Sequence, residues 1–152
     1  MNYGIKRLKG EIIVTMDADT FVEPDCLRKM IAFFDKDIVM AVTPSMAAYK
    51  PKSIWQRIQH IEYAIGVYLR KAFSTVNVMH VTPGAFSAYR KVFFDKHGGF
   101  DEHNITEDTE IALRIQSLDY VLENEPKAVI HTIVPKTFYE LIVQRRRWYT
   151  GL

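Results

Sequence analysis

The apolar residues of this chain recur with two different periods, and the period changes several times along its length. Short apolar runs rich in β-branched residues are typical of buried strands, whereas apolar residues three and four positions apart are typical of helices. The alternation of the two patterns predicts an α/β sheet with helices on both faces. The predicted strands lie at residues 12–16, 38–43, 78–82, 85–90, 120–123 and 128–134.

Two helices are predicted from the spacing of their apolar residues. The longer covers residues 51–75, and the shorter follows Pro24. We expect the apolar side of each helix to face the core. These sides carry Trp55, Ile58, Ile61, Ile65 and Leu69 on the longer helix, and Leu27, Met30, Ile31 and Phe34 on the shorter one.

The first predicted strand, residues 12–16, has apolar residues at consecutive positions. That pattern fits a strand buried on both faces, as in a parallel sheet, and so predicts a central strand. A strand and helix that precede it in the fold are then expected to lie outside these 152 residues. Ligands of such sheets bind beyond the carboxyl ends of the strands, which is where Asp17 and Asp19 stand.

The composition is that of one ordinary globular domain. Of 152 residues, 48% are hydrophobic and 25% are charged, and the formal net charge of +2 is too small to indicate nucleic acid. Cys26 is the only cysteine, which excludes an internal disulfide and fits a reducing compartment. No uncharged apolar run reaches the roughly 18 residues that span a bilayer. The chain is expected to be soluble or peripheral, or part of a membrane protein.

Asp17 and Asp19 form a candidate metal site. Two carboxylates at a strand end can converge on one hard cation, and Mg²⁺ or Mn²⁺ is commonly shared between such oxygens and substrate phosphates. The cation would neutralise charge on a departing diphosphate. The alternative is a turn in which one aspartate caps the next few residues. The bare D-x-D motif favours the turn, and its flanking residues, GEIIVTMDADTFVEPD, favour the metal.

Glu107 and Asp108 form a candidate acid–base site after Thr106, at the start of a predicted helix that ends near Ser117. A carboxylate there can take the proton from an attacking hydroxyl that lies within hydrogen-bond reach. Acidic residues in a first helical turn also simply complement the helix dipole. On this motif alone both interpretations stay open.

Gln144, Arg147 and Trp148 share one face of the last predicted helix, which a capping box at Thr137 and Glu140 begins. Arg147 can clamp phosphate oxygens through its planar fork, and Trp148 offers a flat apolar face that suits a sugar ring. The alternative is a basic helix that lies on a membrane surface; the two are compatible.

In this order, the three groups resemble the processive members of family 2 glycosyltransferases, which include cellulose, chitin, hyaluronan and poly-N-acetylglucosamine synthases. The similarity extends over nearly the whole chain. The spacing and residues of the motifs are most similar to those of the poly-β-1,6-N-acetylglucosamine synthases. The matching segments are GEIIVTMDADTFVEPD, VTPGAFSAYRK, ITEDTEIALRI and QRRRW, which fits the family's Q-x-x-R-W signature.

The resemblance implies a GT-A fold, a UDP-sugar donor (most simply UDP-N-acetylglucosamine), a polysaccharide or oligosaccharide acceptor, and inversion at the anomeric carbon. It also implies the cytoplasmic face of the cell membrane as the location of the full-length protein. By motif it implies a role for each group: metal and diphosphate at Asp17 and Asp19, general base at Asp108 with Glu107 beside it, pyrophosphate and acceptor contacts at Gln144, Arg147 and Trp148, and an acceptor sugar near Gly84.

The sequence departs from this family in what it lacks. The nucleotide-binding half that precedes D-x-D in the family, and the flanking transmembrane helices, have no counterpart in residues 1–152. We therefore expect a partial catalytic domain with weak or no activity alone, which robust UDP-sugar turnover by the purified chain would contradict. Two alternatives remain: a non-catalytic module that binds a membrane or partner through its terminal basic helix, and a non-processive transferase of the same fold.

Overall fold

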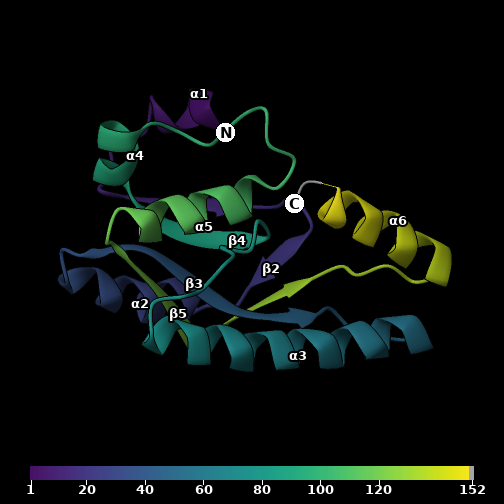
Figure 1. The fold of residues 1–152 in the computed structure, drawn as a ribbon. Helices are drawn as coiled ribbons and strands as arrows, with labels where there is room; N and C mark the ends of the chain where they lie inside the picture. Colours follow the sequence, from purple (N-terminus) through teal and green to yellow (C-terminus); the bar gives the residue numbers. More distant parts are fainter. Residues whose placement is uncertain (151–152) are drawn as a thin grey trace.

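The computed structural model describes residues 1–150, which form a mixed sheet between two layers of helices (Figure 1). The five strands are ordered β1-β4-β3-β5-β2. β3 and β5 run parallel, and the other neighbouring pairs are antiparallel. The strands are β1 (Ile12–Met16), β2 (Thr20–Val22), β3 (Val39–Ala48), β4 (Phe86–Arg90) and β5 (Val121–Thr132).

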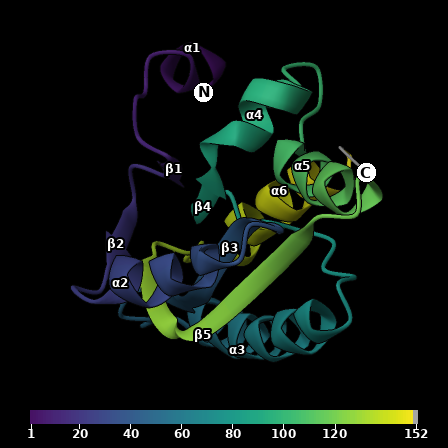
Figure 2. The same ribbon diagram turned by 90° about the vertical axis from the view of Figure 1, so that its left-hand side faces the viewer.

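Helices α4 and α5 cover one face of the sheet, and α2 and α3 cover the other (Figures 1 and 2). On the first face Ile111 and Ile115 pack with Tyr89. On the second face Met30 packs with Ile130. The prediction of helices on both faces is therefore confirmed. The helices are α1 (Asn2–Ile5), α2 (Cys26–Ile31), the 3₁₀ turn η1 (Ala32–Asp35), α3 (Ile54–Thr75), α4 (Lys91–His97), α5 (Glu107–Ser117) and α6 (Phe138–Tyr149).

β1 is an edge strand within residues 1–150, so its predicted central position, in a fold that includes a preceding strand, stays a prediction. It pairs with β4 alone, antiparallel, from Ile12 opposite Arg90 to Met16 opposite Phe86. Only Ile13 is buried, while Val14 and Met16 are exposed. A run of consecutive apolar residues shows that the side chains on both faces of a strand can be buried. It does not show that another part of the protein covers both faces.

Three of the predicted strand boundaries are corrected. Residues 78–82 form no strand, because the backbone N–H of Thr82 donates to the carbonyl of Asp108 (3.1 Å) rather than to a neighbouring strand. β3 continues past Pro44, where its register with β5 shifts. The two segments predicted at 120–123 and 128–134 are one irregular strand, β5.

α3 begins with a capping box in which the Ser53 hydroxyl accepts from the backbone of Gln56 and the Gln56 side chain accepts from the Ser53 N–H. Its orientation is the reverse of the one predicted. The apolar residues expected in the core are exposed, except for the half-buried Trp55, and the face toward the sheet is polar. The buried residues of α3 are Gln56, Gln59, Tyr63, Arg70 and Ser74.

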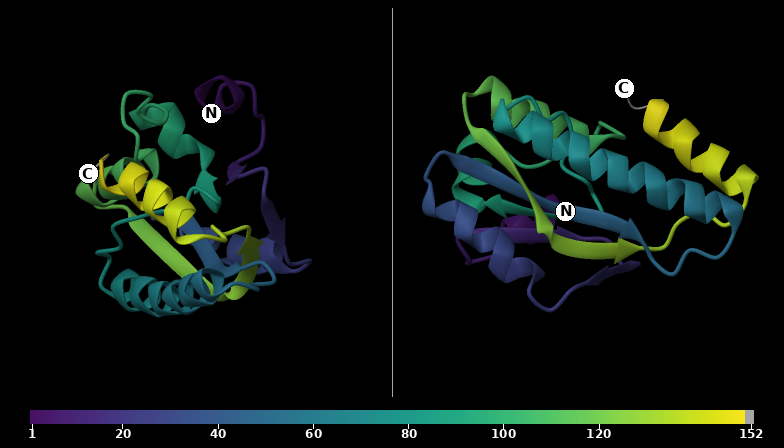
Figure 3. Two further views of the ribbon diagram at one scale, coloured as in Figure 1. Left: turned by 90° about the vertical axis from the view of Figure 1, so that its right-hand side faces the viewer. Right: turned by 90° about the horizontal axis from the view of Figure 1, so that it is seen from below.

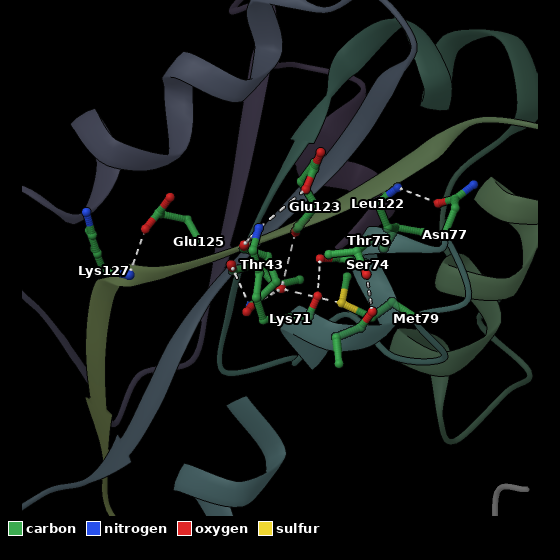
Figure 4. A network of polar contacts seen from close by, with 12 residues as sticks. Thr43, Lys71, Ser74, Thr75, Asn77, Met79, Leu122, Glu123, Glu125 and Lys127 are labelled. Atoms are coloured by element: carbon green, nitrogen blue, oxygen red, sulfur yellow. Dashed lines mark hydrogen bonds and ion pairs between the residues drawn. The ribbon is translucent and has the colours of Figure 1, made fainter. Parts of the chain in front are cut away.

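Hydrogen bonds fix the C-terminal end of α3 and the following loop to the sheet (Figure 4), in addition to the apolar packing of Phe73 and Met79 in the core. Lys71 Nζ donates to the carbonyl of Asn124 (3.0 Å). Asn77 donates to the carbonyl of Tyr120 (2.9 Å) and accepts from the backbone N–H of Leu122 (3.2 Å). Because these bonds engage backbone groups of β5 and its approach, the polar face of α3 is the one fixed to the sheet.

α2 is shorter than predicted and buries a different side. Met30 and Phe34 are buried as expected, together with Cys26, but Leu27 and Ile31 are exposed. The chain tightens into η1 after Ile31, and the side that packs in the core is the one carrying Cys26, Met30 and Phe34.

The capping box predicted for the last helix is confirmed: Thr137 Oγ1 accepts from the backbone of Glu140, whose carboxylate accepts from the Thr137 N–H. None of the described residues of α6 is buried. Among residues 1–150, no helix combines the length and apolar character that crossing a bilayer requires.

Candidate active site

The turn between β1 and β2 carries the two predicted metal ligands. It is closed by backbone groups, since the N–H of Thr20 donates to the carbonyl of Asp17 (3.2 Å). The N–H of Asp17 donates to the carbonyl of Ala85 (3.1 Å), which ties the turn to the segment before β4. Both Asp17 and Asp19 are exposed. The turn predicted as the alternative therefore exists, but backbone bonds close it and leave both carboxylates open to solvent.

Asp17 lies at the meeting point of the three sequence motifs. Partial burial raises the pKa of its carboxyl group, and the nearby carboxylates of Asp19 and Glu107 raise it further. The guanidinium of Arg147 opposes this rise. The charges of Glu107, at the start of α5, and of Arg147, near the end of α6, therefore act on the β1–β2 turn. The ribbon draws these ends of the two helices toward the same side of the molecule (Figure 1).

Asp108 lies in the first turn of α5, directly against the loop before β4. Its main-chain carbonyl accepts from both the N–H (3.1 Å) and the hydroxyl (2.9 Å) of Thr82. Its carboxylate accepts from the backbone N–H of Thr109 (2.9 Å) and from that of Gly84. A Cβ placed on Gly84 would lie 3.9 Å from Asp108 Oδ2, which is ordinary contact. Gly84 therefore acts here through its N–H and not through the absence of a side chain.

Burial raises the pKa of Asp108, and the carboxylate of Glu107 raises it further, while the two backbone N–H donors lower it. A base whose pKa is raised toward the working pH holds a proton more strongly once it has taken it. Acids in a first turn can also merely complement the helix dipole, but that role does not require a half-buried carboxylate. The geometry favours the acid–base interpretation of this motif.

Gln144, Arg147 and Trp148 all lie on α6, as predicted. Gln144 and Trp148 are half-buried, and Gln144 Oε1 is buried without a hydrogen-bond partner in the described part of the chain. Arg147 is exposed, and its charge lowers the pKa of Asp17. Of the three side chains, Arg147 is the one whose charge acts on the β1–β2 turn.

Three residues that the sequence did not single out support this end of the site. The guanidinium of Arg145 lies over the ring of Trp148, 4.2 Å from its centroid, and Arg145 Nη2 donates to Glu62 Oε2 of α3 (2.6 Å). Burial raises the pKa of Tyr63, and Asp19 is among the charges that act on it. The only sequence signal for this contact was the position of Arg145 three residues before Trp148 on one helical face.

Asp17 and Asp19 are the described side chains that fit a divalent cation best, because both are exposed carboxylates on one turn. Within residues 1–150 no group of three or more His, Cys, Asp and Glu side chains is placed to enclose a metal ion. This donor set fits Mg²⁺ or Mn²⁺, which is commonly held by one or two carboxylates together with substrate phosphates and water. It does not fit a closed structural site.

Comparison with known proteins agrees with this geometry. The family model described as "Glycosyl transferase family group 2" matches residues 12–152. The poly-β-1,6-N-acetyl-D-glucosamine synthase of Staphylococcus epidermidis is 33% identical over 154 residues, covering 99% of this chain and 37% of that protein. The corresponding synthase of Staphylococcus aureus strain COL is 32% identical over the same share of each chain.

A solved structure with the same fold is the mannosyltransferase PcManGT from Pyrobaculum calidifontis, in complex with GDP-Man and Mn²⁺. It matches with a TM-score of 0.74 and 22% identity, covering 99% of this chain and 39% of that one. The GT-A-like α/β fold is thereby confirmed. The chain spans well under half the length of each of these relatives. On the family match and on these relatives, the chain belongs to family group 2 of the glycosyl transferases.

Proposed function

We propose that this chain is the metal- and acceptor-binding portion of an inverting transferase, which moves N-acetylglucosamine from its UDP-sugar onto a growing polysaccharide. The observation that carries the proposal is that the loop before β4 bonds to both acidic motifs, through Ala85 to the backbone of Asp17 and through Thr82 to the backbone of Asp108. The charges of Glu107 and Arg147 also act on Asp17. The names of the staphylococcal relatives support the choice of sugar.

The proposed reaction is a single displacement. Asp108 takes the proton from an acceptor hydroxyl as that oxygen attacks the anomeric carbon, and the bond from this carbon to the UDP oxygen breaks with inversion. Arg147 stabilises the charge that develops on the departing diphosphate. Mg²⁺ or Mn²⁺ held by Asp17 and Asp19 would supply further neutralisation of that charge. Trp148, backed by Arg145, offers its ring to a sugar.

A membrane-surface location of the full-length protein, on the cytoplasmic side where UDP-sugars are made, belongs to this proposal. It is supported by α6, on which exposed apolar residues accompany the basic ones. Such a helix can lie in a headgroup region. The exposed apolar residues of α6 are Phe138, Tyr139, Ile142, Val143 and Tyr149.

Titration calorimetry of the 152-residue chain with UDP, in the presence and absence of Mn²⁺, tests the metal assignment. We expect binding that requires the metal and that is lost in Asp19→Asn, because the amide removes one anionic ligand without changing the shape of the side chain. Asp37→Asn is the matched control, since Asp37 is exposed and lies before β3, away from the β1–β2 turn.

The same titration with inorganic pyrophosphate separates diphosphate recognition from nucleoside recognition. We expect UDP and pyrophosphate to bind with similar affinity, because the proposed contacts of Asp17, Asp19 and Arg147 are all to the metal and the diphosphate. Metal-dependent heat that survives Asp19→Asn would contradict the metal assignment. Binding of anionic vesicles with no metal-dependent binding of either ligand would favour the non-catalytic membrane module instead.

The pH dependence of transfer tests the environment of Asp108. A base acts when deprotonated, so transfer should decrease as the pH falls through its raised pKa. Glu107→Gln removes a neighbouring negative charge that raises this pKa. We therefore expect the acidic limb of the kcat profile to move to lower pH, measured on the active enzyme that carries this chain. Glu110→Gln is the control, because Glu110 pairs with Arg114 (2.9 Å) instead. An unmoved limb in Glu107→Gln would exclude Asp108 as the group that the profile reports.

A further inference from the structure

The outer face of α3 is apolar, although its inner face is buried and polar. Figure 3 shows α3 outermost on the lower side of the molecule, with no described element over that face. An apolar stripe that a helix turns away from its own core has no stabilising contact in the monomer. Its members are Ile54, Ile58, Ile61, Ile65 and Tyr68, each between 45% and 74% exposed, and the exposed Ala72.

The spacing of this stripe identifies the kind of partner. Successive members are separated by four, three, four, three and four residues, which is the a/d repeat of a coiled-coil seam. In that repeat Ile58, Ile65 and Ala72 occupy a positions, and Ile54, Ile61 and Tyr68 occupy d positions. The exposed Leu69 widens the apolar side at an e position near the C-terminal end of the stripe. The a/d repeat itself fits another α-helix packed along it.

The residues that flank the seam favour α3 of a second copy, aligned in parallel. In a parallel pair, each g residue faces the e residue five positions later on the other helix. This places the guanidinium of Arg57 beside the partner's Glu62, and Ala64 beside the partner's Leu69. An antiparallel pair would instead bring Arg57 to the partner's Lys71, which offers no carboxylate and whose ammonium group donates to the carbonyl of Asn124 (3.0 Å).

The carboxylate of Glu62, on one flank of the seam, is already positioned for such a pair. Glu62 accepts from Arg145 Nη2 (2.6 Å), so α6 fixes its carboxylate at the edge of the seam. A carboxylate can accept from two guanidinium groups at once. The ring contact of Trp55 with Phe138 (4.8 Å between centroids) keeps α6 along the same flank and off the apolar stripe. The whole helix of 22 residues is about 33 Å long.

We propose that two copies of this chain associate through a parallel, two-stranded α3–α3 coiled-coil seam. The apolar seam residues lie outside the candidate active site, whereas Glu62 on the flank also accepts from Arg145, which lies over the ring of Trp148. The interface removes the exposed isoleucines from water and pairs Arg57 with the partner's Glu62 on both sides of the two-fold axis.

Sedimentation velocity of the 152-residue chain over a wide range of concentrations tests the proposal. We expect a reversible dimer, and a monomer at every concentration for the double variant Ile61→Asp, Ile65→Asp. Leu113→Asp is the matched control, because Leu113 is an exposed apolar residue on α5, and this variant should dimerise normally. Unchanged circular dichroism of all variants shows that folding is intact.

Two further variants test the parallel alignment. Arg57→Glu should weaken the dimer, because it faces the partner's Glu62, whereas in an antiparallel pair it would not face that carboxylate and the dimer should be little changed. Ile61→Cys should form an intermolecular disulfide on mild oxidation, because a d residue faces its own copy in a parallel pair; the native Cys26 is fully buried and does not compete. A monomeric native chain overturns the proposal, as does binding of phosphatidylglycerol vesicles that Ile61→Asp, Ile65→Asp abolishes in the absence of a dimer.

Discussion

Asp108→Asn is expected to lower sugar transfer about 10²- to 10⁴-fold, which is the usual contribution of a positioned general base. Asparagine keeps the shape of the side chain, and its oxygen can still accept from the backbone N–H of Thr109, so the local structure should persist. What it loses is the ability to take a proton. Binding of UDP should be unchanged, because the metal and diphosphate contacts are assigned to the β1–β2 turn. The measurement is kcat with saturating donor in the active enzyme that carries this chain.

A stability measurement on the isolated chain accompanies this prediction and needs no activity. The pKa of Asp108 is raised in the folded state, so folding favours the protonated form. The free energy of unfolding therefore decreases as the pH rises from the unfolded pKa through the folded one. Asp108→Asn should raise the melting temperature near neutral pH, and this gain should vanish at pH values below the unfolded pKa.

Asp95→Asn is the control for both measurements, because Asp95 lies on α4 and pairs with Lys91 at the surface. It should leave transfer unchanged and give no gain in melting temperature. Transfer that survives Asp108→Asn would show that another group accepts the proton. A loss of UDP binding in the same variant would show that the carboxylate serves the donor rather than the acceptor.

The sequence predicted the candidate site better than it predicted the burial of the helices. The D-x-D turn, the first turn of α5 and the face of α6 are local features, because caps, turns and strand ends are set by neighbouring residues. Local signals such as the capping box of Thr137 and Glu140 were confirmed for that reason. The convergence of Asp17, Glu107 and Arg147 is not local, and only the resemblance to a family brought them together before the structure did.

The orientation of α3 shows why the rest was not predictable. Hydrophobic periodicity shows that a helix has an apolar side, but not whether the core of the same chain or another body covers it. In α3 the side toward the sheet instead holds Gln59, which donates to the carbonyl of Pro135 (2.9 Å), and the buried Arg70, whose pKa burial lowers to about 10. The apolar run of β1 has the same ambiguity, since coverage on one face or two leaves the same sequence pattern.

The buried guanidinium of Arg70 is an unfavourable feature of the polar inner face of α3. Its Nε and Nη2 are buried without a hydrogen-bond partner in the described residues, and no carboxylate is among the groups that act on it. Buried donors in native proteins are nearly always satisfied by protein or by ordered water. Within residues 1–150, α3 therefore places an unpartnered basic group inward while four of its isoleucines face outward.

Arg147→Ala is expected to lower kcat about 10²- to 10³-fold, the usual effect of removing one group that stabilises developing negative charge. Arg147 is the basic residue whose charge reaches Asp17, where it opposes the rise in the carboxyl pKa. Its loss removes a counter-charge from the departing diphosphate and from the metal ligand together. Arg147→Lys should recover only part of the rate, since an ammonium group cannot bind two phosphate oxygens in a planar fork.

Arg146→Ala is the matched control, because Arg146 is an equally exposed neighbour on the same helix turn. A large loss of kcat in Arg147→Ala with near-normal activity in Arg146→Ala assigns the effect to one guanidinium at the diphosphate. Equal losses in both variants would contradict that role, because they would show that α6 contributes its overall positive charge, as a helix on an anionic membrane surface does. The comparison thus decides between the two interpretations of the QRRRW segment that its sequence left compatible.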